Sequence, residues 1–211
     1  MKILVIAATN QEIAFTRSVN IDVAITGVGI AATTYHLQKK LQQTKYDFVI
    51  QVGIAGAFSK EFKLGATGLV QRDCFADLGI EEKGIFTSIF DANLEDKNKF
   101  PFTNKWLINN NSELLRKSSF ELLKGATVSK VSDNILQTEQ ILQTYNPEIE
   151  TMEGAAFHYV CLQENIPFAQ IRSISNYVGE RDKSKWKINE AIKNANAGVE
   201  TLLKEISWIL A

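Results

Sequence analysis

Short apolar runs rich in Val and Ile alternate along this chain with segments of helical period, and this alternation constrains the fold most strongly. Apolar runs without polar alternation are typical of strands that are covered on both faces. The segments between them place apolar residues three and four positions apart, as amphipathic helices do. The sequence therefore predicts an α/β fold, with helices packed around a mainly parallel or mixed sheet. The predicted strands are 3–8, 22–26, 48–53, 68–71, 127–131 and 168–175, and the predicted helices lie around 30–41, 114–123 and 188–209.

A hairpin and a long loop interrupt this alternation in the middle of the chain. Two strand-like stretches, 74–78 and 85–90, flank a predicted turn at 79–84. The segment 91–111 is rich in Asn and Lys and is predicted to be a surface loop before the next helix. No internal repeat or linker is evident, and 211 residues suffice to bury a sizeable core. We therefore expect one domain over residues 1–211.

The charge and hydropathy of the chain argue against large partners. The formal net charge is −1 and no run of five like charges occurs, so no surface for nucleic acid or for an anionic membrane is expected. No apolar run is long enough to cross a bilayer, and the run 2–8 is too short for a signal sequence. We therefore expect a cytoplasmic protein that binds a small molecule.

Cysteine and histidine are too sparse to predict a metal site or a disulfide. Cys74 and Cys161 belong to no C-x-x-C pair, and His36 and His158 form no H-E-x-x-H motif. The cysteines are expected to be small core residues, and the histidines to be helix residues with ordinary partners. No metal and no cofactor are predicted.

A glycine-rich turn follows the second predicted strand. Residues 27–32 read GVGIAA and fit the G-x-G-x-x-A pattern of dinucleotide-binding proteins. The acidic residue of that pattern belongs at the end of the next strand, whereas Asp47 stands at its start. We therefore favour a tight strand-to-helix turn close to a ligand. The small residues at 52–57, at the end of another strand, would border the same crevice.

Three polar side chains stand where predicted strands end or a helix begins. Glu12 follows the first strand and fits a helix-capping box that starts at Thr9. Glu153 opens a helical segment, where a carboxylate is favourable next to the helix N-terminus. Asn176 closes the last predicted strand, where an amide is common in turns. Each residue has an ordinary structural explanation, but the three together, at strand ends of one sheet, indicate a ligand site.

Five segments spread over nearly the full length resemble the purine nucleoside hydrolase and phosphorylase superfamily. They read MKILVIAATNQEI, TGVGIAATT, VIQVGIAGAF, VSDNIL and TMEGAAFHYVCLQENIPFAQIRSISN, and the block MEGAA followed by IRSIS is highly specific. Within the superfamily, the chain resembles the branch of methylthioadenosine/S-adenosylhomocysteine nucleosidases and futalosine hydrolases. The resemblance implies a three-layer α/β/α sandwich around a central mixed sheet, as in nucleoside phosphorylases, and a homodimer.

The resemblance also implies roles for residues around the sugar. Glu12 matches the carboxylate that activates water for attack on the anomeric carbon. Met152 and Glu153 match the pair that lines the ribose, with the carboxylate binding its hydroxyls. Arg172 matches a residue that supports these groups from behind. Such residues suit glycosidic cleavage through an oxocarbenium-like sugar.

Further positions concern the purine base. The resemblance implies that Ile135 makes an apolar contact to the base and that Leu136 makes a backbone contact to its edge. Ile54 stands where adenine-specific relatives commonly have Ser, which removes a hydroxyl near the sugar. Ile135 stands where those relatives commonly have an aromatic residue. Stacking on the base is therefore expected from another side chain, with Phe75 and Tyr177 as candidates.

Asn176 occupies the position at which nucleosidases for adenine nucleosides carry Asp. An amide can donate to a six-oxo group and accept from a protonated ring nitrogen, so the resemblance implies release of hypoxanthine. Leaving a buried polar group unpaired costs about 1–3 kcal/mol, enough to favour one purine class. Phosphorylases of six-oxopurine nucleosides recognise the base with an amide in the same way, so Asn176 alone does not exclude them. Because 27–29 and 56–58 lack the Ser-Arg type of phosphate-binding sequence, water is the expected nucleophile.

Two segments, ADLGIEEKG (76–84) and SNYVGERDKSKWKI (175–188), resemble the futalosine hydrolase branch. That branch cleaves futalosine to hypoxanthine and dehypoxanthine futalosine in menaquinone biosynthesis. The carboxylated aromatic group of futalosine calls for a cation, and Arg181 is the candidate, with a salt bridge to Asp182 as its structural alternative. Three alternatives remain open: a methylthioadenosine/S-adenosylhomocysteine nucleosidase, a six-oxopurine nucleoside phosphorylase, and a nucleotide-binding protein without turnover.

Overall fold

The computed structural model describes residues 1–15, 19–131 and 133–209, with side chains through residue 206. Its elements follow one another along the chain as β1 (Ile3–Ala7), η1 (Asn10–Glu12), β2 (Ile21–Ile25), α1 (Ile30–Gln43), β3 (Phe48–Ala57), β4 (Thr67–Asp73), β5 (Gly79–Glu82), β6 (Ile85–Ser88), β7 (Leu107–Ile108), α2 (Ser112–Lys117), β8 (Glu121–Thr127), α3 (Ile135–Tyr145), β9 (Ile149–Thr151), α4 (Gly154–Gln163), β10 (Phe168–Tyr177), η2 (Lys183–Lys185) and α5 (Ile188–Ile209).

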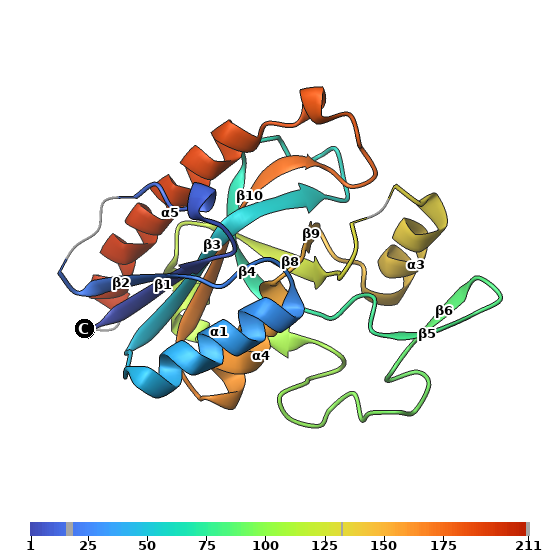
Figure 1. The fold of residues 1–211 in the computed structure, drawn as a ribbon, viewed down its shortest axis with the longest axis horizontal. Coiled ribbons are helices and arrows are strands. Elements are labelled where there is room, and N and C mark those ends of the chain that lie inside the picture. Colours follow the sequence, from blue (N-terminus) through green and yellow to red (C-terminus); the bar gives the residue numbers. More distant parts are fainter. Residues whose placement is uncertain (16–18, 132, 210–211) are drawn as a thin grey trace.

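Eight strands of the described residues form one mixed sheet (Figure 1). Within it, β3 pairs in parallel with β1 and β10 and antiparallel with β9. β10 also pairs with β4, β4 with β8, and β8 with β9. Because β3 pairs with both β10 and β9, these five strands form a closed circuit of pairings. Because β1, β3 and β10 are parallel neighbours, their carboxyl ends meet at one edge of the sheet.

Different helices cover the two faces of this sheet. One core cluster contains Val5 of β1 and Val199 of α5. The next residue of β1, Ile6, points to the opposite face and belongs to a cluster with Leu37 of α1 and Phe157 of α4. Figure 1 shows α5 on one side of the sheet and α1 with α4 on the other. The predicted α/β fold with helices around a mixed sheet is confirmed.

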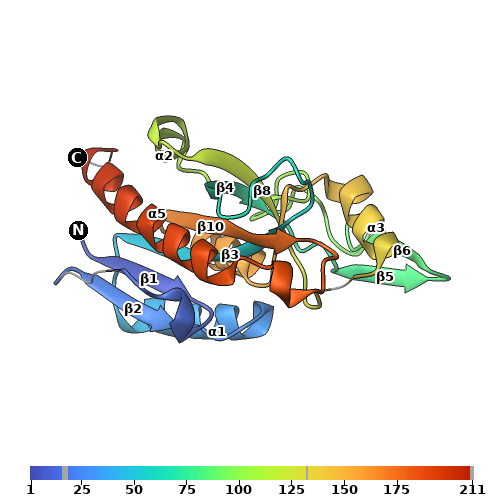
Figure 2. The same ribbon diagram turned by 90° about the horizontal axis from the view of Figure 1, so that it is seen from above.

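The predicted hairpin exists, but its strands are shifted. The first strand, β5, occupies the segment 79–82 that the sequence analysis assigned to the turn, and β5 pairs with β6. The turn itself is Lys83-Gly84, and both residues have positive φ, 53° and 79°. Two-residue hairpin turns require such angles, and glycine supplies them without strain. Figure 2 shows the hairpin projecting beside α3, where Gln140 Nε2 donates to Gly84 O at 2.7 Å.

Two predictions around residue 120 are wrong. The predicted helix at 114–123 ends at Lys117, and the predicted strand at 127–131 is replaced by the earlier strand β8. The segment that follows Phe120 reads ELLKGAT and favours a helix in its first residues. In the fold it lies between β4 and β9 and pairs with both strands. Tertiary pairing therefore outweighs local helix propensity. Apart from the shifted hairpin, the other predicted strands agree with the structure to within four residues at their ends.

Candidate active site

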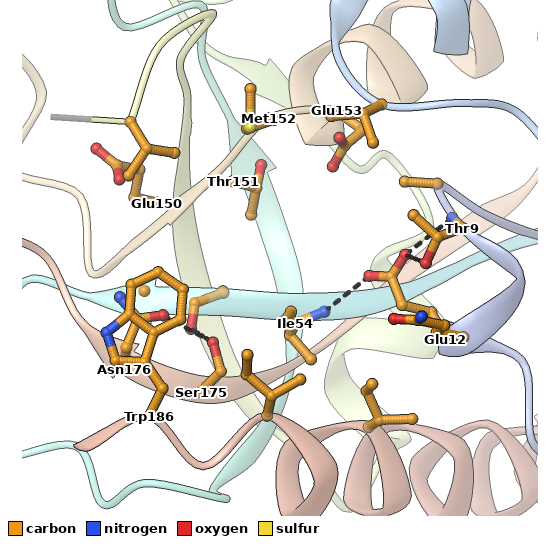
Figure 3. Close-up of a pocket in the computed structure, with 18 residues that line it drawn as sticks. Thr9, Glu12, Ile54, Glu150, Thr151, Met152, Glu153, Ser175, Asn176 and Trp186 are labelled. Carbon is orange, nitrogen blue, oxygen red and sulfur yellow. Dashed lines mark hydrogen bonds between the residues drawn. The ribbon is translucent and has the colours of Figure 1, made fainter. Parts of the chain in front are cut away.

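A cavity of about 350 Å³ opens where β1, β3 and β10 end (Figure 3). Its wall is formed by the residues after β1, by the ends of β3 and β10, by residues 150–153 before α4, and by the start of α5. Ligands of open α/β sheets collect at the carboxyl ends of parallel strands. Asp47 lies at the opposite edge, where its carboxylate accepts from the Lys2 backbone N at 2.6 Å. The dinucleotide interpretation of the glycine turn therefore lacks its acidic residue.

Glu12 lies at one end of the cavity and is held by three donors. Its Oε2 accepts from the backbone N of Thr9 at 3.0 Å, as in the predicted capping box, and also from Oγ1 of Thr9 at 3.0 Å. Its Oε1 accepts from the backbone N of Ile54 at 3.4 Å. Glu12 is only 9% exposed and lines the cavity. These contacts fix the carboxylate in a place where it can accept a proton from a bound water.

Glu153 lies at the same end of the cavity as Glu12 (Figure 3). It is the N-cap residue of α4, and its Oε1 accepts from the backbone N of Gly29 at 3.0 Å. Its Oε2 lies 3.8 Å from Nη2 of Arg172. Arg172 is buried, donates to Gln51 Oε1 at 2.9 Å, and does not belong to the cavity lining. Arg172 therefore contacts Glu153 from outside the cavity lining, and its role in the site stays a prediction.

A buried polar network holds the start of α4. Asp73 Oδ1 accepts from Thr127 Oγ1 at 2.8 Å, and Thr127 Oγ1 accepts from the backbone N of Ala155 at 2.7 Å. Burial raises the pKa of Asp73, the Thr127 hydrogen bond and the charge of Arg172 oppose this rise, and the net pKa is about 6. Because the network reaches the first turn of α4, it fixes the direction in which Glu153 points.

Asn176 lies at the other end of the cavity. Its Nδ2 donates to Tyr177 O at 3.0 Å, and its Oδ1 accepts from Ser175 Oγ at 2.8 Å. One Nδ2 hydrogen and one Oδ1 lone pair remain for a ligand. The residue belongs to β10, which continues through Tyr177, so the turn that the sequence offered as its ordinary explanation is absent at this position.

Glu150 is a residue of this cavity that the sequence analysis missed. It lies on β9, is 8% exposed, and lines the cavity at the same end as Asn176 (Figure 3). In the part of the chain that the structure describes, no hydrogen bond or ion pair engages its carboxylate. Burial, together with the charge of Asp77, raises the pKa of Glu150 to about 7 against a smaller opposing effect of Arg181. The signal in the sequence was a lone charge between Ile149 and Thr151 in a short buried strand.

The raised pKa of Glu150 predicts a pH-dependent effect on stability. The folded protein keeps this proton up to about pH 7, whereas the unfolded chain loses it near the usual value of 4.5. Through this group, the free energy of unfolding therefore falls as pH rises from about 4.5 to about 7. Glu150→Gln removes this dependence. We compare the free energy of unfolding of the variant with that of the unchanged protein by urea unfolding. The difference should shift in favour of the variant by on the order of 2–3 kcal/mol between about pH 5 and about pH 8.

Glu139→Gln, on an exposed position of α3, is the matched control for this measurement. It makes the same chemical change without altering a buried carboxyl, so its stability should follow that of the unchanged protein at both pH values. Identical pH dependence in Glu150→Gln and in the control would contradict the protonated, buried state of Glu150.

Trp186 supplies an aromatic ring to the cavity lining, next to Asn176 (Figure 3). Phe75 and Tyr177, the candidates from the sequence, do not belong to that lining. Arg181 also lies outside it, with its guanidinium carbon 5.8 Å from the centre of the Trp186 ring. Trp186 was missed because it stands in an irregular segment, and only the path of the chain from β10 to α5 brings it to the cavity.

The remaining candidates divide into two groups. Met152 and Ile54 line the cavity between its two ends. Ile135 and Leu136 begin α3, are 72% and 65% exposed, and lie outside the lining. The structure therefore brings the sugar-side candidates together and leaves this pair of base-side candidates apart from them.

The cysteines and histidines occupy ordinary positions. Cys74 and Cys161 are free and buried, and the buried His158 on α4 contacts Leu107 O through Nδ1 at 3.0 Å. Within the described part of the chain, no group of three or more His, Cys, Asp or Glu residues is arranged to hold a metal ion. Across the same residues, no helix is both long and apolar enough to span a membrane.

Known proteins resemble this chain in sequence and in fold. The chain is 29% identical over 184 residues to a futalosine hydrolase of Thermus thermophilus, covering 85% of this chain and 80% of that protein. It is 26% identical over 202 residues to a 5'-methylthioadenosine/S-adenosylhomocysteine nucleosidase of Buchnera aphidicola, covering 92% and 79%. The solved native structure of futalosine hydrolase of Helicobacter pylori strain 26695 matches with a TM-score of 0.77 at 15% identity, over 97% of both chains. Residues 12–210 match the family model described as the phosphorylase superfamily, and the chain therefore belongs to that superfamily.

Proposed function

We propose that this chain is an N-glycosidic hydrolase that cleaves futalosine to hypoxanthine and dehypoxanthine futalosine, a step of menaquinone biosynthesis. The observation that carries the proposal is the division of one cavity into two ends (Figure 3). Two carboxylates, Glu12 and Glu153, stand at one end, and the amide of Asn176 stands at the other. The similarity to futalosine hydrolases supports the choice of substrate.

In the proposed reaction, the sugar lies at the end with the carboxylates. Glu12 takes a proton from water while the water oxygen forms a bond to the anomeric carbon. The bond between that carbon and the purine nitrogen breaks, and its electron pair leaves with the base. Glu153 accepts hydrogen bonds from the ribose hydroxyls, and its negative charge stabilises the oxocarbenium-like sugar.

The purine lies at the end with Asn176. The five-membered-ring nitrogen of the leaving base takes a proton from solvent, and Glu12 returns the proton of the attacking water to solvent, so the protons balance. The free Nδ2 hydrogen donates to the six-oxo group, and the free lone pair of Oδ1 accepts from the protonated ring nitrogen. Trp186, which lines this end, offers an apolar face for the base. A leaving base that is protonated and hydrogen-bonded departs as a neutral molecule, which lowers the barrier to cleavage.

Incubation with three nucleosides tests the proposal. Futalosine, inosine and methylthioadenosine are each supplied with and without phosphate, and the free purine and the sugar product are followed by chromatography. We expect hypoxanthine release from futalosine that does not depend on phosphate. Adenine release from methylthioadenosine alone, phosphate-dependent cleavage of inosine, or binding without release of any base would each overturn the proposal in favour of one of the alternative functions.

Asn176→Asp should shift the preference between purine classes. In this variant one carboxylate oxygen takes the place of Nδ2, 3.0 Å from Tyr177 O, and faces the six-oxo group without a proton to donate. We expect the ratio of kcat/KM for futalosine to that for its six-amino analogue to fall by about 10- to 100-fold. Competition between the two substrates in one reaction measures this ratio directly. An unchanged ratio would remove Asn176 from base recognition.

The proposal includes further expectations from the sequence. Arg181 is assigned to the carboxylated aromatic end of futalosine, and Ile135 and Leu136 to the base, contacts that a substrate complex would test. A cytoplasmic homodimer without nucleic acid or membrane partners, built as one three-layer α/β/α domain over residues 1–211, also belongs to the proposal.

A further inference from the structure

Glu150 and Asn176 occupy one row across three adjacent strands. Gly56 of β3 is paired with Glu150 of β9 on one side and with Asn176 of β10 on the other. Residues in register on neighbouring strands point to the same face, so the carboxylate and the amide project into the cavity side by side (Figure 3). Two strand spacings of about 4.8 Å separate their Cα atoms by about 10 Å.

Two local features keep the space between them open. Gly56 has no side chain, and a Cβ added there would lie only 3.3 Å from Asn176 Nδ2. A β-bulge lies between Ile174 and Asn176, because Ile174 is opposite Ala55 and Asn176 is opposite Gly56. The bulge brings Asn176, rather than the preceding residue, into the row. Both features leave the stretch of β3 between Glu150 and Asn176 without a side chain.

The Glu150 carboxylate faces this space without a donor from the described residues. The neighbouring strands offer it Gly56 and Ala126, which have no polar side chains. A buried carboxylate without a partner is costly, so a ligand that supplies an N–H group gains a strong hydrogen bond here.

We propose that Glu150 accepts the hydrogen bond of the purine N1–H group and thereby selects six-oxopurine over six-amino substrates. Along the edge of a six-oxopurine, the five-ring nitrogen, the six-oxo group and N1–H follow one another. Asn176 takes the first two, and Glu150, next in the row, takes the third. A six-amino purine has a lone pair at N1, which Glu150 repels once the carboxyl has lost its proton, so the substrates are compared at a pH above the Glu150 pKa of about 7. This inference rests on the proposed function, because it assumes that the cavity holds the base of the substrate.

The test compares Glu150→Leu and Glu150→Gln with the unchanged protein on futalosine and on its six-amino analogue. Leu removes the acceptor at similar size, and Gln keeps an acceptor without the charge. We expect the kcat/KM preference for the six-oxo substrate to fall by about 10- to 100-fold in Glu150→Leu and by less in Glu150→Gln. Glu139→Leu, on the exposed surface of α3, is the matched control and should keep the preference.

A binding measurement completes the test. Calorimetry compares hypoxanthine with 1-methylhypoxanthine, which has no N1–H group. We expect the methyl group to weaken binding by at least about tenfold in the unchanged protein, and by much less in Glu150→Leu or, if that variant does not fold, in Glu150→Gln. An unaltered preference in both variants, or an equal effect of methylation in all proteins, would overturn the role of Glu150. Failure of the unchanged protein to release hypoxanthine from futalosine would instead overturn the proposed function.

Discussion

Glu12→Gln should lower kcat for hypoxanthine release by about 10²- to 10⁴-fold, the usual contribution of a general base. An amide cannot take the proton of the attacking water, so the chemical step is affected directly. The fold should survive, because Gln at this position of a capping box also accepts from the backbone N of Thr9. Binding of the free base should change little, since Glu12 lies at the opposite end of the cavity from Asn176.

Single-turnover rates of hypoxanthine release, together with calorimetry of hypoxanthine, separate these two effects. Glu113→Gln is the control: it makes the same change on α2, where the carboxylate pairs with Lys117 at the surface, and it should retain full activity. If Glu12→Gln lost base affinity and turnover in equal proportion, Glu12 would be a structural residue of the cavity and another group would activate the water.

The sequence predicted the fold well where local pattern and tertiary environment agree. The runs that became β1 and β3 are almost wholly apolar, and both strands and β10 are buried almost throughout because helices cover both faces of the sheet, so strand pattern and burial coincide. The prediction failed at β8, whose first residues favour a helix and whose strand state depends on pairing with β4 and β9. Pairing between segments far apart in the sequence is invisible to a local pattern.

The same distinction explains which site residues could be predicted. Glu12, Glu153 and Asn176 each stand at the end of a strand or the start of a helix, and a parallel sheet brings such ends together. Glu150 could not be found in this way, because its place beside Asn176 follows from the pairing of β9 with β3 and from the bulge in β10. Trp186 depends on the path of an irregular segment, which no periodicity describes.

Glu153→Gln should lower kcat/KM for futalosine by about 10²- to 10³-fold. The carboxylate accepts two hydroxyl hydrogen bonds and places a negative charge next to a sugar that becomes positive in the transition state. Gln retains the acceptor for Gly29 N but loses the charge and replaces one acceptor oxygen by a donor. The structure should tolerate the change, because Arg172 keeps its 2.9 Å hydrogen bond to Gln51 when its 3.8 Å contact with the carboxylate becomes neutral.

A substrate without the ribose hydroxyls shows whether the loss arises at the sugar. On the 2'-deoxy and 3'-deoxy analogues of futalosine, the unchanged protein already lacks one of the hydroxyl contacts, so Glu153→Gln should cost several-fold less there than on futalosine. Glu164→Gln, at the other end of α4, is the matched control. Its exposed carboxylate accepts from Gln38 Nε2 at 2.7 Å, outside the cavity lining, so the change should leave all rates unchanged. An equal loss on all three substrates would mean that Glu153 acts by positioning α4 and Gly29. The ribose hydroxyls would then be bound by another residue at the same end of the cavity.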